Sequence, residues 1–164
     1  MGNSVELGHQ SSLYINTGSY VAPTWTELDL SRDVTMMDST DKIEATTRRT
    51  ARNGYKANVP GLRELGWKFE MLVPAAGETS TAFDAIEAAR KAGTSVDILH
   101  VEGGIISVDD LDATRAVCGV FGGEKGEPIN NVSTRSYELS FALNADQDVP
   151  ETGTTSGSAF VAAS

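Results

Sequence analysis

The sequence predicts a mainly β fold, in which one helix covers one side of a sheet or sandwich. Three observations support this prediction: 16 glycines along the chain, several short stretches in which apolar and polar residues alternate, and only one stretch with clear helical spacing. Alternation places successive side chains on opposite faces of a strand, and glycine-containing turns commonly join such strands. With 164 residues, 40% of them hydrophobic, the chain is long enough for one domain with its own core.

Two long stretches give the clearest strand signal. In residues 66–73 the apolar side chains occupy odd positions from Trp67 onward, and Lys68 lies on the opposite face. Residues 134–143 repeat the pattern, with apolar side chains at odd positions from Tyr137 onward. Shorter strands are expected at residues 12–16, 24–30, 33–37, 41–47, 95–101 and 114–121.

The flanking helix is expected at about residues 79–92. Thr81 and Asp84 have the spacing of a capping box, which satisfies free backbone amides at the start of a helix. Gly93 suits the left-handed conformation in which many helices end. The sequence therefore predicts one helix of about three turns beside the sheet.

A long basic loop is expected at about residues 47–61. Asn53-Gly54 and Pro60-Gly61 are turn-forming pairs, and few apolar residues in this stretch could join a core. We interpret the stretch as an arm or the tip of an extended hairpin.

The net charge of −10 is unevenly distributed. Residues 42–68 contain seven cations and two acids, a net charge of +5, whereas the rest of the chain has six cations against 21 acids, a net charge of −15. The overall charge opposes binding to nucleic acid through phosphates. A positive segment on an acidic body suits attachment to another copy of the same body. A basic hairpin that is merely hydrated explains the charge alone equally well.

The composition divides the chain into three parts. Residues 1–11 are polar, and we expect a flexible N-terminal segment there. Residues 12–145 contain the predicted β-domain. Residues 146–164 are rich in Thr, Gly, Ser and Ala, and we expect a tail that is flexible or ordered only by a neighbour. No apolar run is long enough to span a membrane, and no signal-peptide pattern is found.

Residues that could support catalysis or cofactor binding are sparse. The only histidines are His9, in the polar N-terminal segment, and His100, at the end of a predicted strand, and Cys118 is the only cysteine. Nucleophilic catalysis needs a base held close to the nucleophile, and a Cys/His metal site needs more ligands than these. The acidic turn around Asp109 lacks the spacing of a calcium loop. We therefore expect no enzyme activity, no metal and no cofactor.

Several local sequences, taken in their order along the chain, carry a resemblance to a known family. They are LYINTGSY at residues 13–20, PTWTEL at 23–28, RDVT at 32–35, WKFEM at 67–71 and YELSFAL at 137–143. This series resembles the major tail tube proteins of long-tailed phages and related particles. The likeness extends from about residue 13 to residue 149 and depends on the order of the pieces, since no single motif identifies the family.

The resemblance implies a β-sandwich or barrel-like tail tube fold and a structural role in the virion. Subunits of this family form rings, usually of six, that stack into a hollow tube. Inner strands of neighbouring subunits join into one barrel through which DNA leaves the head without specific binding. The implied partners are further copies of the chain and the tape measure, tail terminator and distal tail proteins. The implied location is the virion tail, after synthesis in the host bacterial cytoplasm, with no membrane contact.

Two groups of residues are candidates for the assembly. In the basic loop, we expect the cations to contact the next ring of the tube: Arg48, Arg49, Arg52 and Lys56. On the two long strands, we expect the polar face to line the lumen: Lys68, Glu70, Ser136, Glu138 and Ser140. A lumen with net negative charge would let DNA slide instead of adhering. A polar face that is merely solvent-exposed is the alternative.

Two other functions fit the same sequence. Another oligomeric virion protein, such as a tail terminator or a decoration protein, would also form rings but would not grow into tubes. A ligand-binding β-sandwich module would use an exposed aromatic side chain, Trp25 or Trp67, as a platform for its ligand. Trp67 is in phase with the apolar face of its strand, so we expect it in the core.

Overall fold

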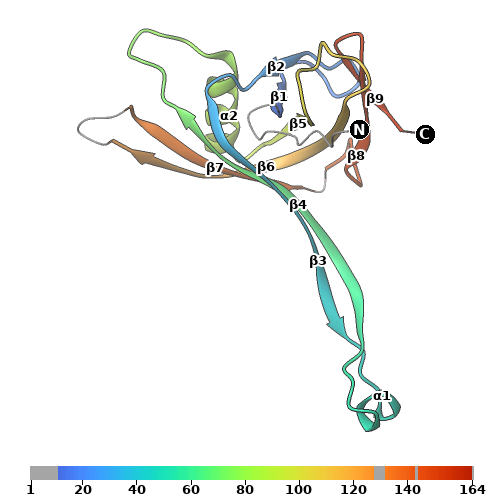
Figure 1. Cartoon of the computed structure of the whole chain (residues 1–164). Coiled ribbons are helices and arrows are strands. Elements are labelled where there is room, and N and C mark those ends of the chain that lie inside the picture. Colours follow the sequence, from blue (N-terminus) through green and yellow to red (C-terminus); the bar gives the residue numbers. More distant parts are fainter. Residues whose placement is uncertain (1–10, 128–131, 143, 164) are drawn as a thin grey trace, which may run out of the picture.

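The computed structural model describes residues 11–127, 132–142 and 144–163, and it consists of a body from which one long arm extends (Figure 1). Its strands are β1 (Ser12–Asn16), β2 (Trp25–Glu27), β3 (Ser31–Glu44), β4 (Asn58–Leu72), β5 (Ser95–Val101), β6 (Asp112–Gly126), β7 (Thr134–Phe141), β8 (Glu151–Ser156) and β9 (Ala159–Ala162). Its helices are α1 (Arg48–Arg52) and α2 (Thr81–Ala92). The prediction of a mainly β fold flanked by a helix is confirmed. The expected flexible segment 1–11 lies outside the described residues, apart from Ser11.

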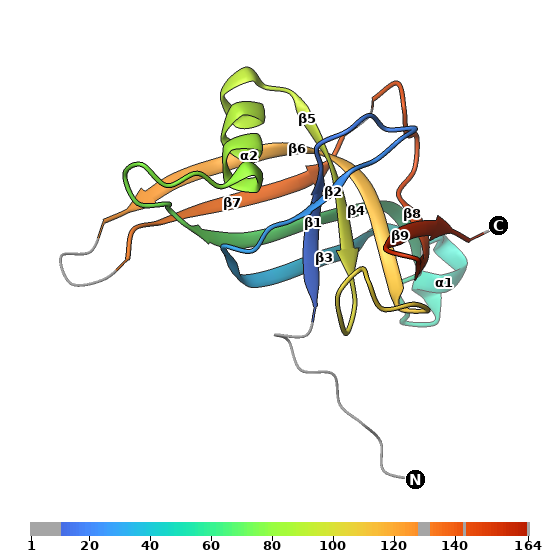
Figure 2. The ribbon, with the colours of Figure 1, turned by 90° about the horizontal axis from the view of Figure 1, so that it is seen from above.

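The strands form one antiparallel sheet with the order β2-β1-β5-β6-β7-β4-β3, and β8 and β9 branch from β6. One side of β6 pairs with β5 over residues 113–119. The other side pairs first with β8 over residues 112–115 and then with β7 over residues 118–126. Because β6 changes partners along its length, the sheet bends around it, as Figure 2 shows from above. We call β6-β7-β4-β3 the arm sheet.

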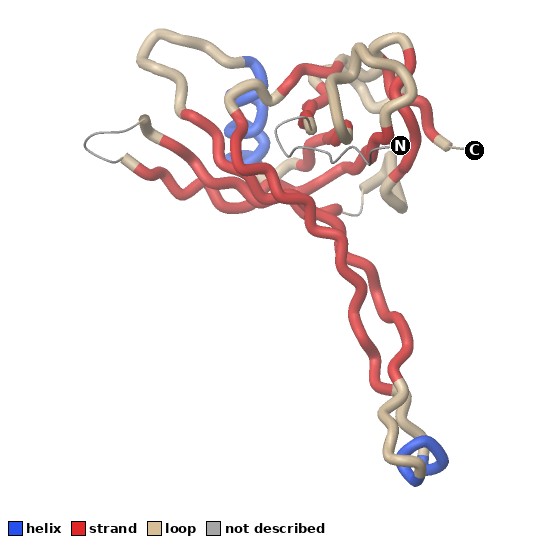
Figure 3. The backbone as a smooth tube through the Cα atoms, in the orientation of Figure 1, coloured by secondary structure: helices blue, strands red, loops and turns tan. Residues whose placement is uncertain are grey.

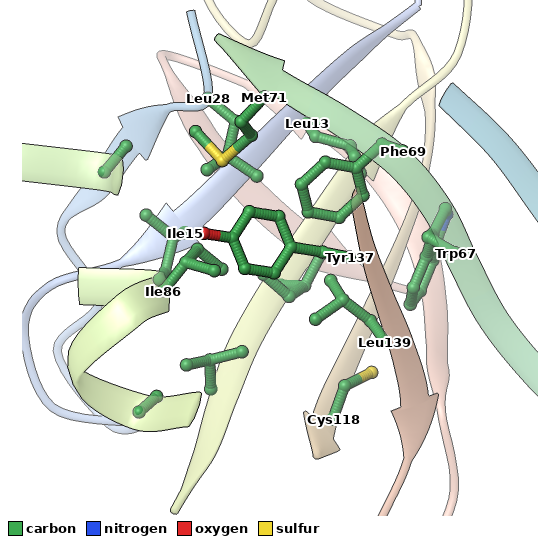
Figure 4. Close-up of a cluster of buried hydrophobic side chains, with 14 of the residues drawn as sticks. Leu13, Ile15, Leu28, Trp67, Phe69, Met71, Ile86, Cys118, Tyr137 and Leu139 are labelled. Carbon is green, nitrogen blue, oxygen red and sulfur yellow. The ribbon is translucent and has the colours of Figure 1, made fainter. Parts of the chain in front are cut away.

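Helix α2 covers the concave side of the bent sheet and closes the core. Ser80 caps its N-terminus by accepting a 3.3 Å hydrogen bond from the Phe83 amide, and Gly93 ends it in the left-handed conformation (φ 68°). Several fully buried core side chains that Figure 4 labels come from β4, α2, β6 and β7: Trp67, Met71, Ile86, Cys118 and Leu139. Full burial of a large apolar side chain stabilises the fold by roughly 1.5–3 kcal/mol.

The arm is a two-stranded hairpin of β3 and β4 that continues beyond the body, with α1 at its tip (Figure 3). The predicted loop at residues 47–61 was therefore too long at its C-terminal end, and the predicted strands 33–37 and 41–47 belong mostly to the single strand β3. The pairs Ile43–Val59 and Glu44–Asn58 carry the ladder into the polar stretch. Pro60 is tolerated because this part of β4 pairs with β3 alone, so one side of the strand needs no backbone donor.

Gly66 marks the point where β4 leaves the body and enters the arm. Its partners are Met37 on β3 and Ser140 on β7, where the pairing with β7 ends. A Cβ atom at this position would overlap the carbonyl oxygen of Leu139. Glycine therefore permits the close approach of β4 and β7 at the base of the arm.

The C-terminal segment differs from the expected flexible tail. Residues 151–162 form the β8–β9 hairpin, and β8 pairs with the start of β6. Gln147 anchors the preceding segment: its side chain accepts a 2.8 Å hydrogen bond from the Val117 amide and donates a 3.2 Å bond to the Arg115 carbonyl. Thr155, which is fully buried, donates to the Val108 carbonyl. Polar side chains and backbone pairing order this segment, and neither produces an apolar periodicity.

Candidate assembly surfaces

The tip of the arm gathers all four cations that the sequence nominated for ring-to-ring contact. Arg48, Arg49 and Arg52 belong to α1, and Lys56 follows in the turn back to β4. All four are exposed, and no ion pair of the described residues involves them. Their shared position at the end of the arm makes the tip strongly positive.

The arm also exposes apolar side chains along its length. Tyr55 and Leu62 are 76% and 82% exposed, and the cross-strand partners Ile43 and Val59 are 53% and 46% exposed. Exposed apolar groups on a thin projection gain no cover from their own body, and such groups commonly mark protein contacts. These residues were not expected from the sequence, because charged and turn residues interrupt their apolar pattern.

The five residues nominated for the lumen share one face of the arm sheet. Register places Lys68 opposite Glu138, Glu70 opposite Ser136, and Ser140 opposite Gly66 on the paired strands β4 and β7. The intervening residues Trp67, Phe69, Tyr137 and Leu139 are buried in the core on the other face.

Ion pairs cross this polar face. The Lys68 Nζ lies 3.3 Å from a carboxylate oxygen of Glu138, and the Arg32 guanidinium on β3 lies 2.9 Å from that of Glu70. Arg32 was not nominated, because only strand register shows that it faces Glu70. The ion pairs are partly exposed, so each is worth at most about 1 kcal/mol.

A shallow hollow of about 470 Å³ lies on this face. Its charged lining consists of one cation and four acids: Lys68, Asp33, Glu70, Glu124 and Glu138. The surface of the hollow therefore has a net negative charge.

The arm sheet has a free edge on each side. Among the described residues, β3 pairs only with β4, and residues 120–126 of β6 pair only with β7. Phe121, beside the β6 edge, is 56% exposed. Free edges present unpaired backbone donors and acceptors to which another strand can bind.

A buried charge network fastens α2 to the arm sheet. Glu87 on α2 accepts a 2.5 Å hydrogen bond from the Tyr137 hydroxyl and two bonds of 3.1 Å from Arg90, and Arg135 lies 3.4 Å away. Burial raises the pKa of Glu87, but the hydrogen bonds from Arg90 and Tyr137 and the charge of Arg135 outweigh burial and lower it to about 2. The carboxylate is therefore charged at neutral pH and holds helix and sheet together.

Arg115 on β6 links the segment between β1 and β2 to the body. The Arg115 guanidinium lies 2.6 Å from Asp97, and its carbon lies 3.9 Å above the centre of the Tyr20 ring and 5.3 Å from that of Trp25. Trp25 is thus packed against a cation of its own chain, and Trp67 is fully buried. Neither tryptophan stands free as a ligand platform.

The described part of the chain shows no grouping of potential metal ligands, since no three His, Cys, Asp or Glu side chains within it lie together as metal ligands would. His100 is buried beside the Trp67 ring, and His9 lies outside the described residues. Burial raises the pKa of the Cys118 thiol to about 12, which keeps it protonated. No helix among the described residues is long and apolar enough to cross a membrane.

The fold can be compared with known proteins. No protein-family model matches the sequence, and no curated protein is similar to it in sequence. Among solved structures, a chain in the tail of an empty gene transfer agent particle, refined with C6 symmetry, matches across 85% of this chain and 96% of its own length (TM-score 0.69, 7% identity).

Two further structures match. A chain of the SPP1 tail tube covers 84% of this chain and 76% of its own length, with a TM-score of 0.63 and 13% identity. A chain of the anti-feeding prophage baseplate covers 96% and 99%, with a TM-score of 0.56 and 10% identity. Identities this low establish similarity of fold alone. The chain therefore has the fold of subunits found in these tail and baseplate assemblies, and the tail tube fold that the sequence predicted is confirmed.

Proposed function

We propose that this chain is a tail tube subunit, which assembles with its own copies into stacked rings and so forms the hollow tube for DNA passage into the host. The observation that carries the proposal is the arm: a two-stranded projection with exposed apolar side chains and, at its tip, four cations that form no ion pair with other described residues. In an isolated subunit the apolar side chains of such an arm stay exposed to water, whereas contact with a second copy would cover them.

The free edges of the arm sheet support ring formation. If β3 of one copy pairs with residues 120–126 of β6 in the next, the backbone groups on both edges are satisfied and the sheet continues around the ring. The two edges are different surfaces, so the contact is head-to-tail. Such contacts form a closed ring when the rotation from one copy to the next divides a full turn evenly. The C6 symmetry of the gene transfer agent tail favours six copies.

The polar face of the arm sheet suits the lumen of such a barrel. The residues that would then face the channel are those expected from the sequence: Lys68, Glu70, Ser136, Glu138 and Ser140. The hollow on this face has one cation against four acids. A negative wall repels phosphates, so DNA would pass without adhering.

The arm tip suits the contact between rings. The body is acidic and the tip is basic, so attraction between successive rings favours a stack with the same polarity throughout. Such a tube has two unlike ends, one of which presents the arms. Distinct tail terminator and distal tail proteins would close these ends, and a tape measure protein would occupy the lumen in the virion tail.

Electron microscopy of the concentrated, purified protein tests the proposal. We expect hollow tubes with a regular axial repeat. Closed rings that never stack would contradict the proposal and indicate a tail terminator or decoration protein. A protein that stays monomeric at every concentration, while limited proteolysis removes its arm, would contradict self-assembly altogether.

A further inference from the structure

We infer that an apolar groove at the base of the arm receives the arm tip of a second copy of this chain. The inference rests on the proposed self-assembly and names the surface that one copy offers to the next. It goes beyond a general attraction between a basic tip and an acidic body, because it assigns one receptor site.

The groove has a volume of about 490 Å³ and a mostly apolar lining. Met36 and Leu65 contribute from the base of the arm, Phe141 from the end of β7, and Val149 and Pro150 from the segment that leads into β8. Val149 is 67% exposed, so the groove opens to the outside of the body. An apolar cleft of this size can receive side chains such as tyrosine or isoleucine.

The walls of the groove are held in place before any partner binds. Gln147, which is 4% exposed, fixes the segment beside Val149 through its two hydrogen bonds to the β6 backbone. The opposite wall belongs to the β3–β4 ladder, in which Asp38 pairs with Leu65. A preformed site binds without the entropic cost of ordering a loop.

The tip of the same chain cannot fill this groove. The ladder runs from Leu65 at the base to Asn58 near the tip, which places the tip about 23 Å away at roughly 3.3 Å per residue. The occupant must therefore come from another molecule. The tip of a second copy carries the matching apolar groups, since Tyr55, Ile43 and Val59 are all exposed.

Charge complementarity favours the same occupant. The charged groove lining consists of Asp38, Arg63 and Asp148, and Arg63 pairs with Asp38. No ion pair of the described residues involves Asp148, and residues 144–151 around it contain three acids and no cation. The tip brings four exposed cations, for which the described part of the chain likewise supplies no ion pair. Tip and groove therefore match in both apolar surface and charge.

The tip and the groove are separate surfaces of one chain, so each copy can bind one neighbour through its tip and another through its groove. A contact of this type can repeat from copy to copy, and it ends only if the series of copies forms a closed ring. It can therefore act along a stack of any length.

Cysteine cross-linking tests the assignment. The variant Tyr55→Cys/Val149→Cys places thiols at the tip and in the groove, while buried Cys118 stays out of reach. After treatment of assembled protein with a short bis-maleimide, we expect a ladder of multimers on a denaturing gel. A mixture of the two single variants should give dimers only. The matched control is Tyr55→Cys/Val108→Cys, whose second thiol lies on another exposed site beside acidic residues.

The outcomes separate the groove from the proposed function. Assembled tubes without a ladder, or a ladder only in the Val108 control, would overturn the groove while tube formation stands. If the unmutated protein forms no assemblies by electron microscopy, both the proposed function and this inference fail.

A charge introduced at position 149 tests the groove independently of cross-linking. Val149→Arg and Val149→Glu remove the same apolar group from an exposed position, so folding should be equal by circular dichroism. Because the tip is positive, we expect Val149→Arg to raise the concentration needed for assembly at least tenfold over Val149→Glu at low salt. Equal values for the two variants would contradict the groove.

Discussion

The hydroxyl of Tyr137 donates a 2.5 Å hydrogen bond to the carboxylate of Glu87, across the interface between α2 and the arm sheet. Removal of this hydroxyl in Tyr137→Phe should lower the free energy of unfolding by roughly 1.5–3 kcal/mol, because the lost bond is buried and joins a charged group. Urea unfolding followed by circular dichroism measures the change. Tyr55→Phe, which removes an exposed hydroxyl at the arm tip, is the control and should change stability little.

The same carboxylate makes stability depend on acid pH. The folded protein holds the pKa of Glu87 at about 2, below the ordinary value of 4.5. The charged form therefore stabilises the fold above about pH 4.5, and this contribution declines as the pH falls toward 2. We expect the stability gap between the unmutated protein and Glu87→Gln to be roughly 2–3 kcal/mol at pH 7 and to shrink across this range. A gap that does not change with pH would show that the charge of Glu87 is not responsible.

Gly66→Ala should destabilise the junction between body and arm. The added methyl group meets the Leu139 carbonyl oxygen, so β4 or β7 must shift, at a cost of roughly 1–3 kcal/mol. Thermal unfolding measures the loss. Gly126→Ala is the matched control, because a methyl group there reaches only an ordinary 3.4 Å contact with Thr134.

Gln147→Ala should loosen the C-terminal segment. It leaves the Val117 amide and the Arg115 carbonyl without their side-chain partner, at a cost of roughly 1–3 kcal/mol per buried group. Hydrogen exchange should become faster in β8 and at Val117, whereas β4 and β7 should keep their protection. Unchanged exchange at Val117 would show that Gln147 does not anchor the segment.

Charge reversal at the arm tip should stop tube growth without unfolding the monomer. We expect Arg48→Glu/Arg49→Glu/Arg52→Glu to abolish the tubes seen by electron microscopy, because the tip would then repel an acidic neighbour. The corresponding triple Arg→Lys variant keeps the charge and should still grow tubes. Tubes of normal length from the Glu variant would rule out electrostatic docking of the tip.

Local apolar patterns and the glycine at the helix end were sufficient to predict one helix and one buried strand, although Ser80 caps the helix and not, as the sequence suggested, Thr81. The helix expected at residues 79–92 is α2, and the strand expected at residues 95–101 is β5. Alternation also separated the polar from the core face of β4 and β7, although their place in a lumen stays a prediction. Each of these signals depends on residues close together in the sequence, so the sequence alone is enough to predict the corresponding element.

Features that depend on distant residues could not be predicted in this way. Glu87 and Tyr137 are 50 positions apart, and only the folded sheet brings them together. The β8–β9 hairpin has no regular apolar pattern from which it could be predicted. Buried polar side chains such as Gln147, which precedes β8, hold this segment against the body instead. The arm extends further than expected because its two strands pair with each other and need no core.

Strand β6 has a mechanical consequence for any assembly built from this chain. Its first half is bonded to β5 and β8, and its second half to β7, which leads through β4 into the arm. Tension applied to the arm therefore reaches the far side of the body through an unbroken series of backbone hydrogen bonds. Where the pull runs along the strands, many of these bonds share the force at once, so the subunit should resist stretching far better than peeling.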